Sequence, residues 1–442
     1  MPLDLEGSSP MLFHRPPEDF APTLPESPMG NVLGFQYRPD PYDPDQMGEL
    51  RFFRCAGVGR WILLHLHELF AADGVAGPNV LLLSGTSWAG TSPSYHVQTP
   101  VGGVLRAPDE EVEAIGRSTF AFLPLLDNNQ QPLTVSGQRA DRRVNALHEM
   151  LMQLARSGRI PGAPSRLEIE RDRLPDGRRR ILLLVGSYAE ARQAQTAVLQ
   201  IREDWHDQVR FLVADNESFE VGWEDGGALR RGEVGKLAQT GAWLLIAPLQ
   251  AIERGHNILN DARKAALGAA YFLVRPHPRP DDIGSAIHAI NHWAVDRSCE
   301  LTAGDTGVSL DERSRAFHAA AYGQWRRFLR LPMVYSTLPP ADRDALTWSE
   351  LVSIWQVIGR LVRGGCEARI FFCDAAFARF TATGVEGGDT GASSLLVNMR
   401  RVLRPYFDES GDVPCADRDL VGLLYRPFYD ALARIQGVAE HA

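Results

Sequence analysis

The sequence predicts an α/β fold, in which a parallel β-sheet carries helices on both of its faces. Between residues 181 and 374, short apolar runs alternate with longer segments of helical periodicity. This alternation is typical of parallel strands joined by helical crossovers. The apolar runs show no alternation of polar and apolar residues, which indicates strands that are covered on both faces.

The N-terminal third of the chain is less regular. Residues 1–47 are rich in Pro, Asp and Gly, which predicts an irregular arm. Apolar residues recur at helical spacing over 49–72, and the apolar run Val-Leu-Leu-Leu within 79–83 predicts a buried strand. Residues 91–140 are mixed, and 144–156 reads as a second helix.

The regular region supplies most of the expected fold. Strands are predicted at 181–186, 209–214, 243–248, 269–276 and 368–374. Helices are predicted at 188–202, 229–238, 281–299, 311–329, 343–363, 393–403 and 417–435. The strand at 79–83 is expected to belong to a different sheet. We therefore predict a Pro-rich arm over 1–47, the tail of a first lobe over 48–135, and a second lobe over 136–442.

The composition and the net charge limit the classes of function that the chain can have. The net charge of the 442 residues is −9, so no global positive field attracts nucleic acid, and any contact with a polyanion must come from local arginine clusters. The five cysteines form no CxxC pair, which favours reduced thiols in a cytoplasm. No apolar run approaches about 20 residues, and the first residues lack the features of a signal peptide. Only Lys236 and Lys264 are lysines, and neither lies in a P-loop.

The segment WQVIGRLVRGG, residues 355–365, is the first candidate site. It places Gln356, Gly359, Arg360 and Arg363 on nearby faces of a predicted helix. Arginine presents a planar fork of donors that suits phosphate groups. An amphipathic helix with a solvated arginine edge would give the same pattern. Because the helix precedes an apolar strand, we expect its end near the carboxyl edge of the sheet, where α/β proteins bind ligands.

Two loops that follow apolar runs are further candidates. APLQAIERGHNILN contains Arg254, Gly255 and Asn257, which could approach and bind a polar ligand. SGTSWAGTSP offers hydroxyl groups, among them those of Ser84 and Thr86. A plain connection between elements explains either loop from local features alone.

Other signals are weaker. The stretch around Ser87 is one residue short of a nucleophile elbow, and no helix follows it directly. His288 and His292 are four residues apart and could share a metal, but no acidic residue of an HExxH motif accompanies them. DGRRR (176–180) and QWRRFLR (324–330) are basic patches that could contact nucleic acid, although such patches are more often solvated edges.

WQVIGRLVR resembles the sixth motif, Q-x-x-G-R-x-x-R, of superfamily 2 helicases of the DinG/XPD-like kind. The resemblance implies that Gln356, Arg360 and Arg363 face the phosphates of ATP, with Arg360 or Arg363 as the arginine finger. The lobe would then be a RecA-like helicase C-terminal domain.

Three further stretches resemble motifs of the same family in the same order. APLQAIERGHNIL is similar to the fifth motif, which implies coupling of nucleotide to nucleic acid through Gly255 and Asn257, with Arg254 beside them. LLLVGSYAEA is similar to the fourth, which implies backbone phosphate contacts from Ser187 and Tyr188. LLLSGTSWAG is similar to the third, with Ser84-Gly85-Thr86 at the end of a first motor lobe.

The sequence SGTSWAGTSPSYHVQTPVGGVL is also similar to helicases of prokaryotic Piwi-associated defence islands. The family's first and second motifs, the P-loop and the acidic metal-binding box, are not found, and Glu253 is shifted from the acidic position of the fifth motif.

The resemblance, over roughly residues 75–100 and 175–380, therefore implies a partner. ATP with Mg²⁺ would be bound mainly by a P-loop lobe in the same or a neighbouring polypeptide, and single-stranded DNA or RNA would cross both lobes. The alternative is a degenerate lobe that hydrolyses nothing and serves as a nucleic-acid-binding or scaffolding module.

Overall fold

A computed structural model describes most of the chain. The described residues are 31–38, 49–56, 59–68, 71, 74–158, 162–215, 227–253, 257–278, 284–298, 307–332, 334–408 and 413–439. The chain divides into two compact units: Met1–Leu82 with Ile283–Arg330, and Leu83–Asp282 with Leu331–Ala442. We call them unit 1 and unit 2.

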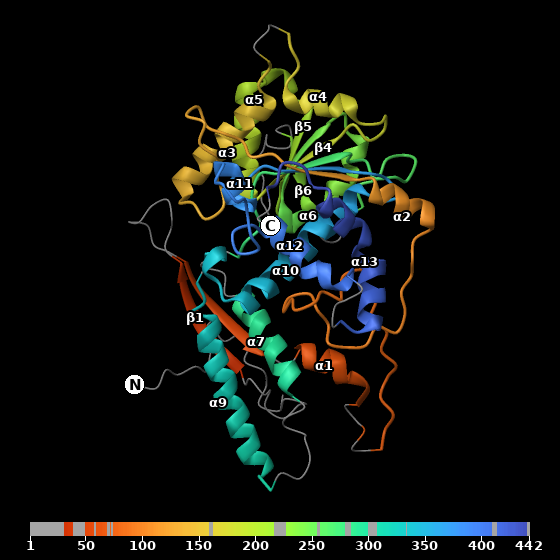
Figure 1. Ribbon diagram of the computed structural model, residues 1–442, viewed down its shortest axis with the longest axis vertical. Coiled ribbons are helices and arrows are strands. Elements are labelled where there is room, and N and C mark those ends of the chain that lie inside the picture. The colour runs from red at the N-terminus through yellow and green to blue at the C-terminus, as the bar shows by residue number, and fades with distance from the viewer. Residues whose placement is uncertain are drawn as a thin grey trace, which may run out of the picture. The chain divides into compact units, whose positions relative to one another are not determined.

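Unit 2 is built around a seven-stranded sheet in which every strand pairs in parallel (Figure 1). The strand order is β3-β9-β8-β4-β7-β5-β6. The strands are β3 (Thr119–Phe122), β4 (Ile181–Val185), β5 (Val209–Val213), β6 (Ala228–Arg230), β7 (Leu244–Pro248), β8 (Ala269–Phe272) and β9 (Arg369–Phe372). This is the α/β architecture that the sequence predicts.

Alternate side chains of the central strands enter two separate hydrophobic cores. In β4, Leu182 and Leu184 join one core, whereas Ile181, Leu183 and Val185 join the other. Both faces of these strands are buried, as predicted, which explains why their sequences are uniformly apolar.

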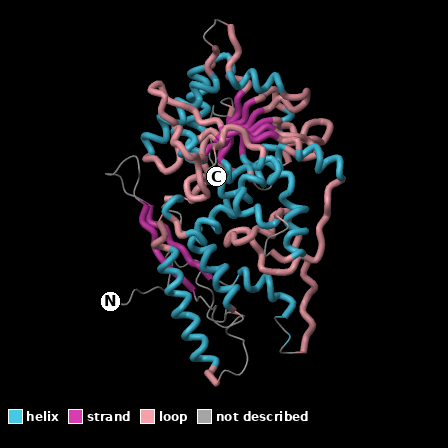
Figure 2. Tube along the Cα trace, viewed as in Figure 1, coloured by secondary structure: helices cyan, strands magenta, loops and turns pink. Residues whose placement is uncertain are grey.

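Each core is closed by its own set of helices (Figure 2). The first core includes side chains of α6 (Leu249–Ile252), α10 (Pro340–Leu361), α12 (Leu395–Leu403) and α13 (Cys415–Ala433). The second includes side chains of α3 (Ala140–Ala155), α4 (Arg166–Arg173) and α5 (Tyr188–Ile201). Two shorter helices, α2 (Asp109–Gly116) and α11 (Arg379–Thr383), also belong to unit 2.

The described residues of unit 1 form a two-stranded antiparallel sheet and three α-helices. Strand β1 (Asn31–Arg38) pairs with β2 (Glu49–Ala56). The helices are α1 (Gly59–His65), α7 (Gly284–Arg297) and α9 (Leu310–Phe328). In the parts of the two units that the structure describes, no helix is both long enough and apolar enough to span a membrane.

Several predicted elements near the N-terminus are wrong. Part of the expected irregular arm forms β1. The expected helix over 49–72 begins as β2, and its described residues go on to form the short α1 and a 3₁₀ turn at Leu66–Glu68. Residues 79–83 form no strand. The two phenylalanines of ELRFFRCA favour a strand, but the pairing of this strand with β1 cannot be read from local periodicity.

The predicted lobe boundaries also differ from the observed units. Strand β3 lies in the segment predicted as the tail of a first lobe, yet it extends the seven-stranded sheet beside β9. Residues 283–330, predicted within the second lobe, group with the N-terminal residues in unit 1. Residues 1–30 of the predicted arm lie outside the described residues.

Candidate functional site

Helix α10 carries the candidate site on unit 2. It begins with Pro340 in its first turn and is followed by Gly364 and Gly365, whose positive φ angles of 72° and 66° suit a chain leaving a helix. Its apolar face packs in the first core. The polar residues of WQVIGRLVR therefore lie on a helix whose position is fixed by packing.

The end of α10 does not lie where we expected it. The carbonyl of Arg363 accepts a hydrogen bond from the amide of Ala265 at 3.0 Å, and the Arg178 guanidinium donates to the carbonyl of Leu361. Both donors precede strands, Ala265 before β8 and Arg178 before β4. The expectation of the carboxyl edge is wrong, because a helix that leads into a parallel strand delivers the chain to the amino end of that strand.

Arg360 joins α10 to the loop after β7. Its side chain is only 9% exposed, and its Nη2 donates to the backbone carbonyl of Glu253 at 2.7 Å. Burial lowers the pKa of Arg360, the positive charge of Arg363 lowers it further, and Glu253 acts in the opposite direction. The segments 247–260 and 355–365 are therefore in contact here. The guanidinium groups of Arg360 and Arg363 are also close enough for their charges to repel each other.

Arg363 is the more available of the two arginines. Its side chain is partly buried, and burial lowers its pKa. No hydrogen bond or ion pair joins its guanidinium to any residue within the described ranges. Its donors can therefore reach an external anion without breaking a contact inside this part of the chain.

Gln356 links α10 to the third predicted segment. Its Nε2 donates to Oγ1 of Thr86 at 2.7 Å, while its buried Oε1 has no hydrogen-bond partner in the described part of the chain. A Cβ added at Gly359 would meet open space, so this glycine leaves room beside Arg360. Ser84 is exposed, and its hydroxyl accepts from the amide of Thr86 at 3.2 Å.

A hydrogen-bonded group that the sequence did not reveal supports this site. The Tyr95 hydroxyl lies 2.9 Å from Oγ of Ser353 and 3.3 and 3.4 Å from the two carboxylate oxygens of Glu253. Ser353 lies one turn before Gln356, which is a readable signal. The participation of Tyr95 is not readable, because it depends on how the segment after Thr86 folds back onto α10.

Glu350, one turn further back on α10, is a buried carboxyl group. Burial raises its pKa to about 8, the negative charge of Glu253 adds to this, and the positive charge of Arg275 opposes it. Glu350 is therefore mostly protonated at neutral pH, so it adds little negative charge near the arginines.

The predicted fifth-motif residues are only partly placed. Arg254 and Gly255 lie outside the described residues, whereas Asn257 is described and exposed. The hydrogen bond from Arg360 to Glu253 nevertheless fixes where this loop begins.

Ser187 and Tyr188 stand at the start of α5, after β4. The Ser187 hydroxyl accepts from the amide of Glu190 at 3.1 Å and caps the helix. The amide of Gly186 donates to the carboxylate of Glu190 at 2.7 Å, and Glu190 pairs with Arg143. A carboxylate therefore already occupies this helix N-terminus, and a backbone phosphate would have to displace it. Tyr188 packs partly against the first core.

The weaker sequence signals receive little support. In DGRRR, the buried Arg178 binds only backbone carbonyls. Within the described ranges, no group of three or more His, Cys, Asp or Glu residues could hold a metal, including around His288 and His292. No described histidine hydrogen-bonds to the hydroxyl of Ser87. In unit 1, Arg326 lies over the exposed ring of Tyr322 at 5.8 Å.

Comparison of the chain with protein-family models and with curated proteins finds no match to either.

Proposed function

We propose that this chain supplies the C-terminal motor lobe of an ATP-dependent nucleic-acid helicase or translocase. A second lobe, in the same or a neighbouring polypeptide, would supply the P-loop. The observation that carries the proposal is the neighbouring pair Arg360 and Arg363. Burial lowers the pKa of both arginines, and the positive charge of Arg363 lowers the pKa of Arg360 further. Bringing like charges together costs free energy, which a bound polyphosphate would recover.

The contacts around this pair support the same function. Arg360 binds the loop after β7, and Gln356 binds Thr86. The three segments that resemble the third, fifth and sixth motifs are thus joined directly. In the assembled motor, Arg363 would donate to the γ-phosphate region and stabilise the charge that develops there. The Oε1 atom of Gln356, which has no hydrogen-bond partner in the described chain, would accept from the attacking water.

ATP would arrive with Mg²⁺, which neutralises phosphate charge and is bound mainly by the complementary lobe. In this lobe, the candidate coupling residues are Gly255 and Asn257, next to Arg254. Single-stranded DNA or RNA would be held through its backbone, so binding should weaken as salt rises.

An exposed apolar segment supports the need for a second lobe. The sequence of residues 79–83 has the character of a buried strand, but the structure leaves it unpaired, with Leu81 80% and Leu83 81% exposed. Large apolar side chains gain about 25 cal/mol per Å² when they leave water. A sheet edge of the complementary lobe would satisfy both the backbone and the side chains of this segment.

The test is ATP hydrolysis by this chain assembled with its P-loop-bearing lobe, in the presence of single-stranded DNA. Arg363→Ala is the sharpest variant, because Arg363 donates no side-chain hydrogen bond within the described residues and its loss should leave folding intact. Loss of an arginine finger lowers the rate by about 10³-fold or more. Arg379→Ala is the matched control, since Arg379 is exposed and has no such bond either.

An unchanged hydrolysis rate in Arg363→Ala and in Arg360→Ala would refute the motor function. Salt-sensitive binding of single-stranded DNA without any hydrolysis in the assembly would favour the degenerate binding module instead.

A further inference from the structure

Helix α10 carries four polar side chains on one face. Ser349, Ser353, Gln356 and Arg360 follow one another at the three- and four-residue intervals that make neighbours along a helix. The first three bond to the segment 86–95, and Arg360 bonds to the loop after β7. One helix face therefore joins two stretches of unit 2 that are far apart in the sequence.

The segment 86–95 packs directly on α10. The Ser92 hydroxyl, which is fully buried, lies 2.8 Å from the hydroxyl of Ser349 and accepts from the amide of Tyr95 at 3.1 Å. Gly90 has a positive φ of 50°, and a Cβ at this position would overlap the ring of Trp348. Because the backbone approaches the helix so closely, the segment has little freedom to shift along it.

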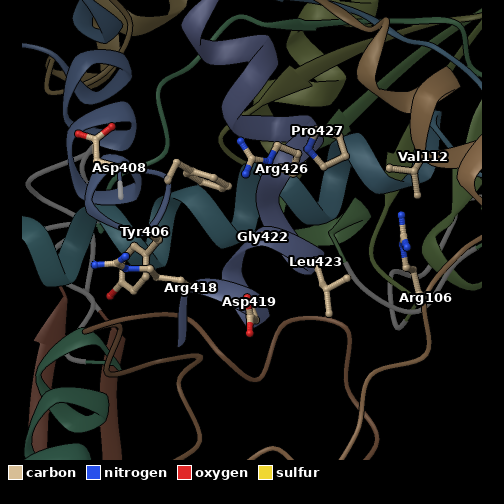
Figure 3. Close-up of a pocket in the computed structure, with 11 residues that line it drawn as sticks. Arg106, Val112, Tyr406, Asp408, Arg418, Asp419, Gly422, Leu423, Arg426 and Pro427 are labelled. Atoms are coloured by element: carbon tan, nitrogen blue, oxygen red, sulfur yellow. The ribbon is translucent and has the colours of Figure 1, made fainter. Parts of the chain in front are cut away.

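Trp88 gives the same segment a second anchor. Its ring packs edge to face on that of Tyr406, with centroids 5.3 Å apart, and its carbonyl accepts from the Tyr425 hydroxyl at 2.8 Å. Tyr406 is labelled in Figure 3, where it lines a pocket of about 640 Å³ on unit 2. Contacts with α10, with α13 and with the turn that carries Tyr406 therefore fix the segment that ends at Tyr95.

Glu253 is held at both of its ends. The Tyr95 hydroxyl lies 3.3 and 3.4 Å from its two carboxylate oxygens, and its backbone carbonyl accepts from Nη2 of Arg360 at 2.7 Å. An ionised carboxylate only accepts hydrogen bonds, so the Tyr95 hydroxyl donates to it and can accept in turn from Ser353, 2.9 Å away. Glu253 is only 9% exposed, so water has little access to replace either contact.

We propose that Tyr95 is a positioning residue of the candidate site. By holding the Glu253 carboxylate, Tyr95 fixes the backbone carbonyl that receives Arg360, and it thereby sets where this guanidinium lies. The inference rests on the proposed function for what Arg360 does in the motor. The position of Arg360 can nevertheless be measured on this chain alone.

Labelling of the full chain with phenylglyoxal, a reagent for accessible guanidinium groups, tests the proposal. Tyr95→Phe keeps the ring and removes only the hydroxyl, so Arg360 should be labelled about fivefold faster or more, as followed by peptide mass spectrometry. Arg178, which is also buried, should keep its rate, because general unfolding would raise both rates. Tyr429→Phe is the matched control, since the Tyr429 hydroxyl makes no hydrogen bond within the described residues.

A second variant shows whether Tyr95 acts through Glu253. Glu253→Ala should raise the labelling rate of Arg360 to a similar extent, and Tyr95→Phe should then add nothing to it. An unchanged rate at Arg360 in Tyr95→Phe, an equal rise at Arg178, or a full additional rise in the double variant would overturn the proposal.

The assembled motor separates this inference from the proposed function. Tyr95→Phe should lower kcat for ATP hydrolysis by about tenfold and change KM by less than about twofold, because Arg360 would act on the transition state. If labelling rises as expected but hydrolysis is unchanged in both Arg363→Ala and Arg360→Ala, the motor function is wrong and the positioning role stands. If Arg363→Ala abolishes hydrolysis while Tyr95→Phe leaves kcat unchanged, only this inference is wrong.

Discussion

At the scale of single residues, the arginine pair depends on a neighbour that carries little charge. Glu350 is buried, and its pKa is raised to about 8, mainly by burial. Nothing in the sequence distinguishes Glu350 from an exposed helical glutamate. Its environment arises only because the strands place Glu253 and Arg275 beside α10, so residue-level reasoning could identify the arginines but not the carboxyl group near them.

Glu350 makes a prediction about pH. Its pKa in the folded protein lies above the ordinary glutamate value, so the native state binds the extra proton between about pH 4.5 and pH 8. The free energy of unfolding should therefore fall as pH rises through this window, by at most about 1.4 kcal/mol per pH unit. Glu350→Gln removes the ionisation and should exceed the wild type in stability by about 2 kcal/mol or more at pH 8.5.

Urea unfolding at pH 5, 7 and 8.5 measures this difference. At pH 5 the two proteins should be similar in stability, since the wild-type carboxyl group is then protonated in the folded state. Glu386→Gln, at an exposed position, is the control and should follow the wild type. Parallel profiles of stability against pH for Glu350→Gln and the wild type would contradict a raised pKa of Glu350 in the folded protein.

At the scale of elements, long periodic segments were predictable and their placement was not. Helices α3, α5, α9, α10, α12 and α13 all lie within a few residues of their predicted ranges. Residues 79–83 have the composition of a strand but lack a partner, because a strand exists only where another strand pairs with it. Likewise, the pattern around Arg178 predicts a basic surface patch, whereas the structure buries this arginine.

Arg178 makes a prediction about how these elements are held together. Its guanidinium donates to the carbonyls of Ala265, Leu267, Leu361 and Glu367. It therefore ties the end of α10 to the segments that lead into β8 and β9. Arg178→Ala would leave these buried acceptors without their donor and should lower the free energy of unfolding by about 3 kcal/mol or more. Urea denaturation measures this loss.

The neighbouring Arg179 provides the control for this variant. Its side chain is about half exposed and pairs with Asp176 on the surface. Arg179→Ala should therefore cost less than about 1 kcal/mol. A loss in Arg178→Ala no larger than that in Arg179→Ala would mean that water replaces the guanidinium at the carbonyls.

At the scale of the whole molecule, the sequence predicts the class of the sheet but not its full extent. Five of the strands lie within longer apolar runs of the sequence, whereas β3 and β6, with 4 and 3 residues, give no distinct signal. The strand order also joins segments far apart in the chain, such as β3 with β9. Residues 283–330 also group with the N-terminal segment, and local sequence patterns do not reveal contacts between segments so far apart in the chain.

This organisation predicts where the molecule opens first. Strands β4, β7 and β8 are central, fully buried strands of the seven-stranded sheet, so their amides should exchange only on global unfolding of unit 2. The pair β1 and β2 forms a separate two-stranded sheet, and such sheets are marginally stable in water. Hydrogen exchange followed by mass spectrometry should therefore show β1–β2 peptides exchanging at least about 100-fold faster than β4 peptides, a ratio that corresponds to about 2.7 kcal/mol. Equal protection of the two sheets would instead mean that units 1 and 2 unfold as one cooperative body.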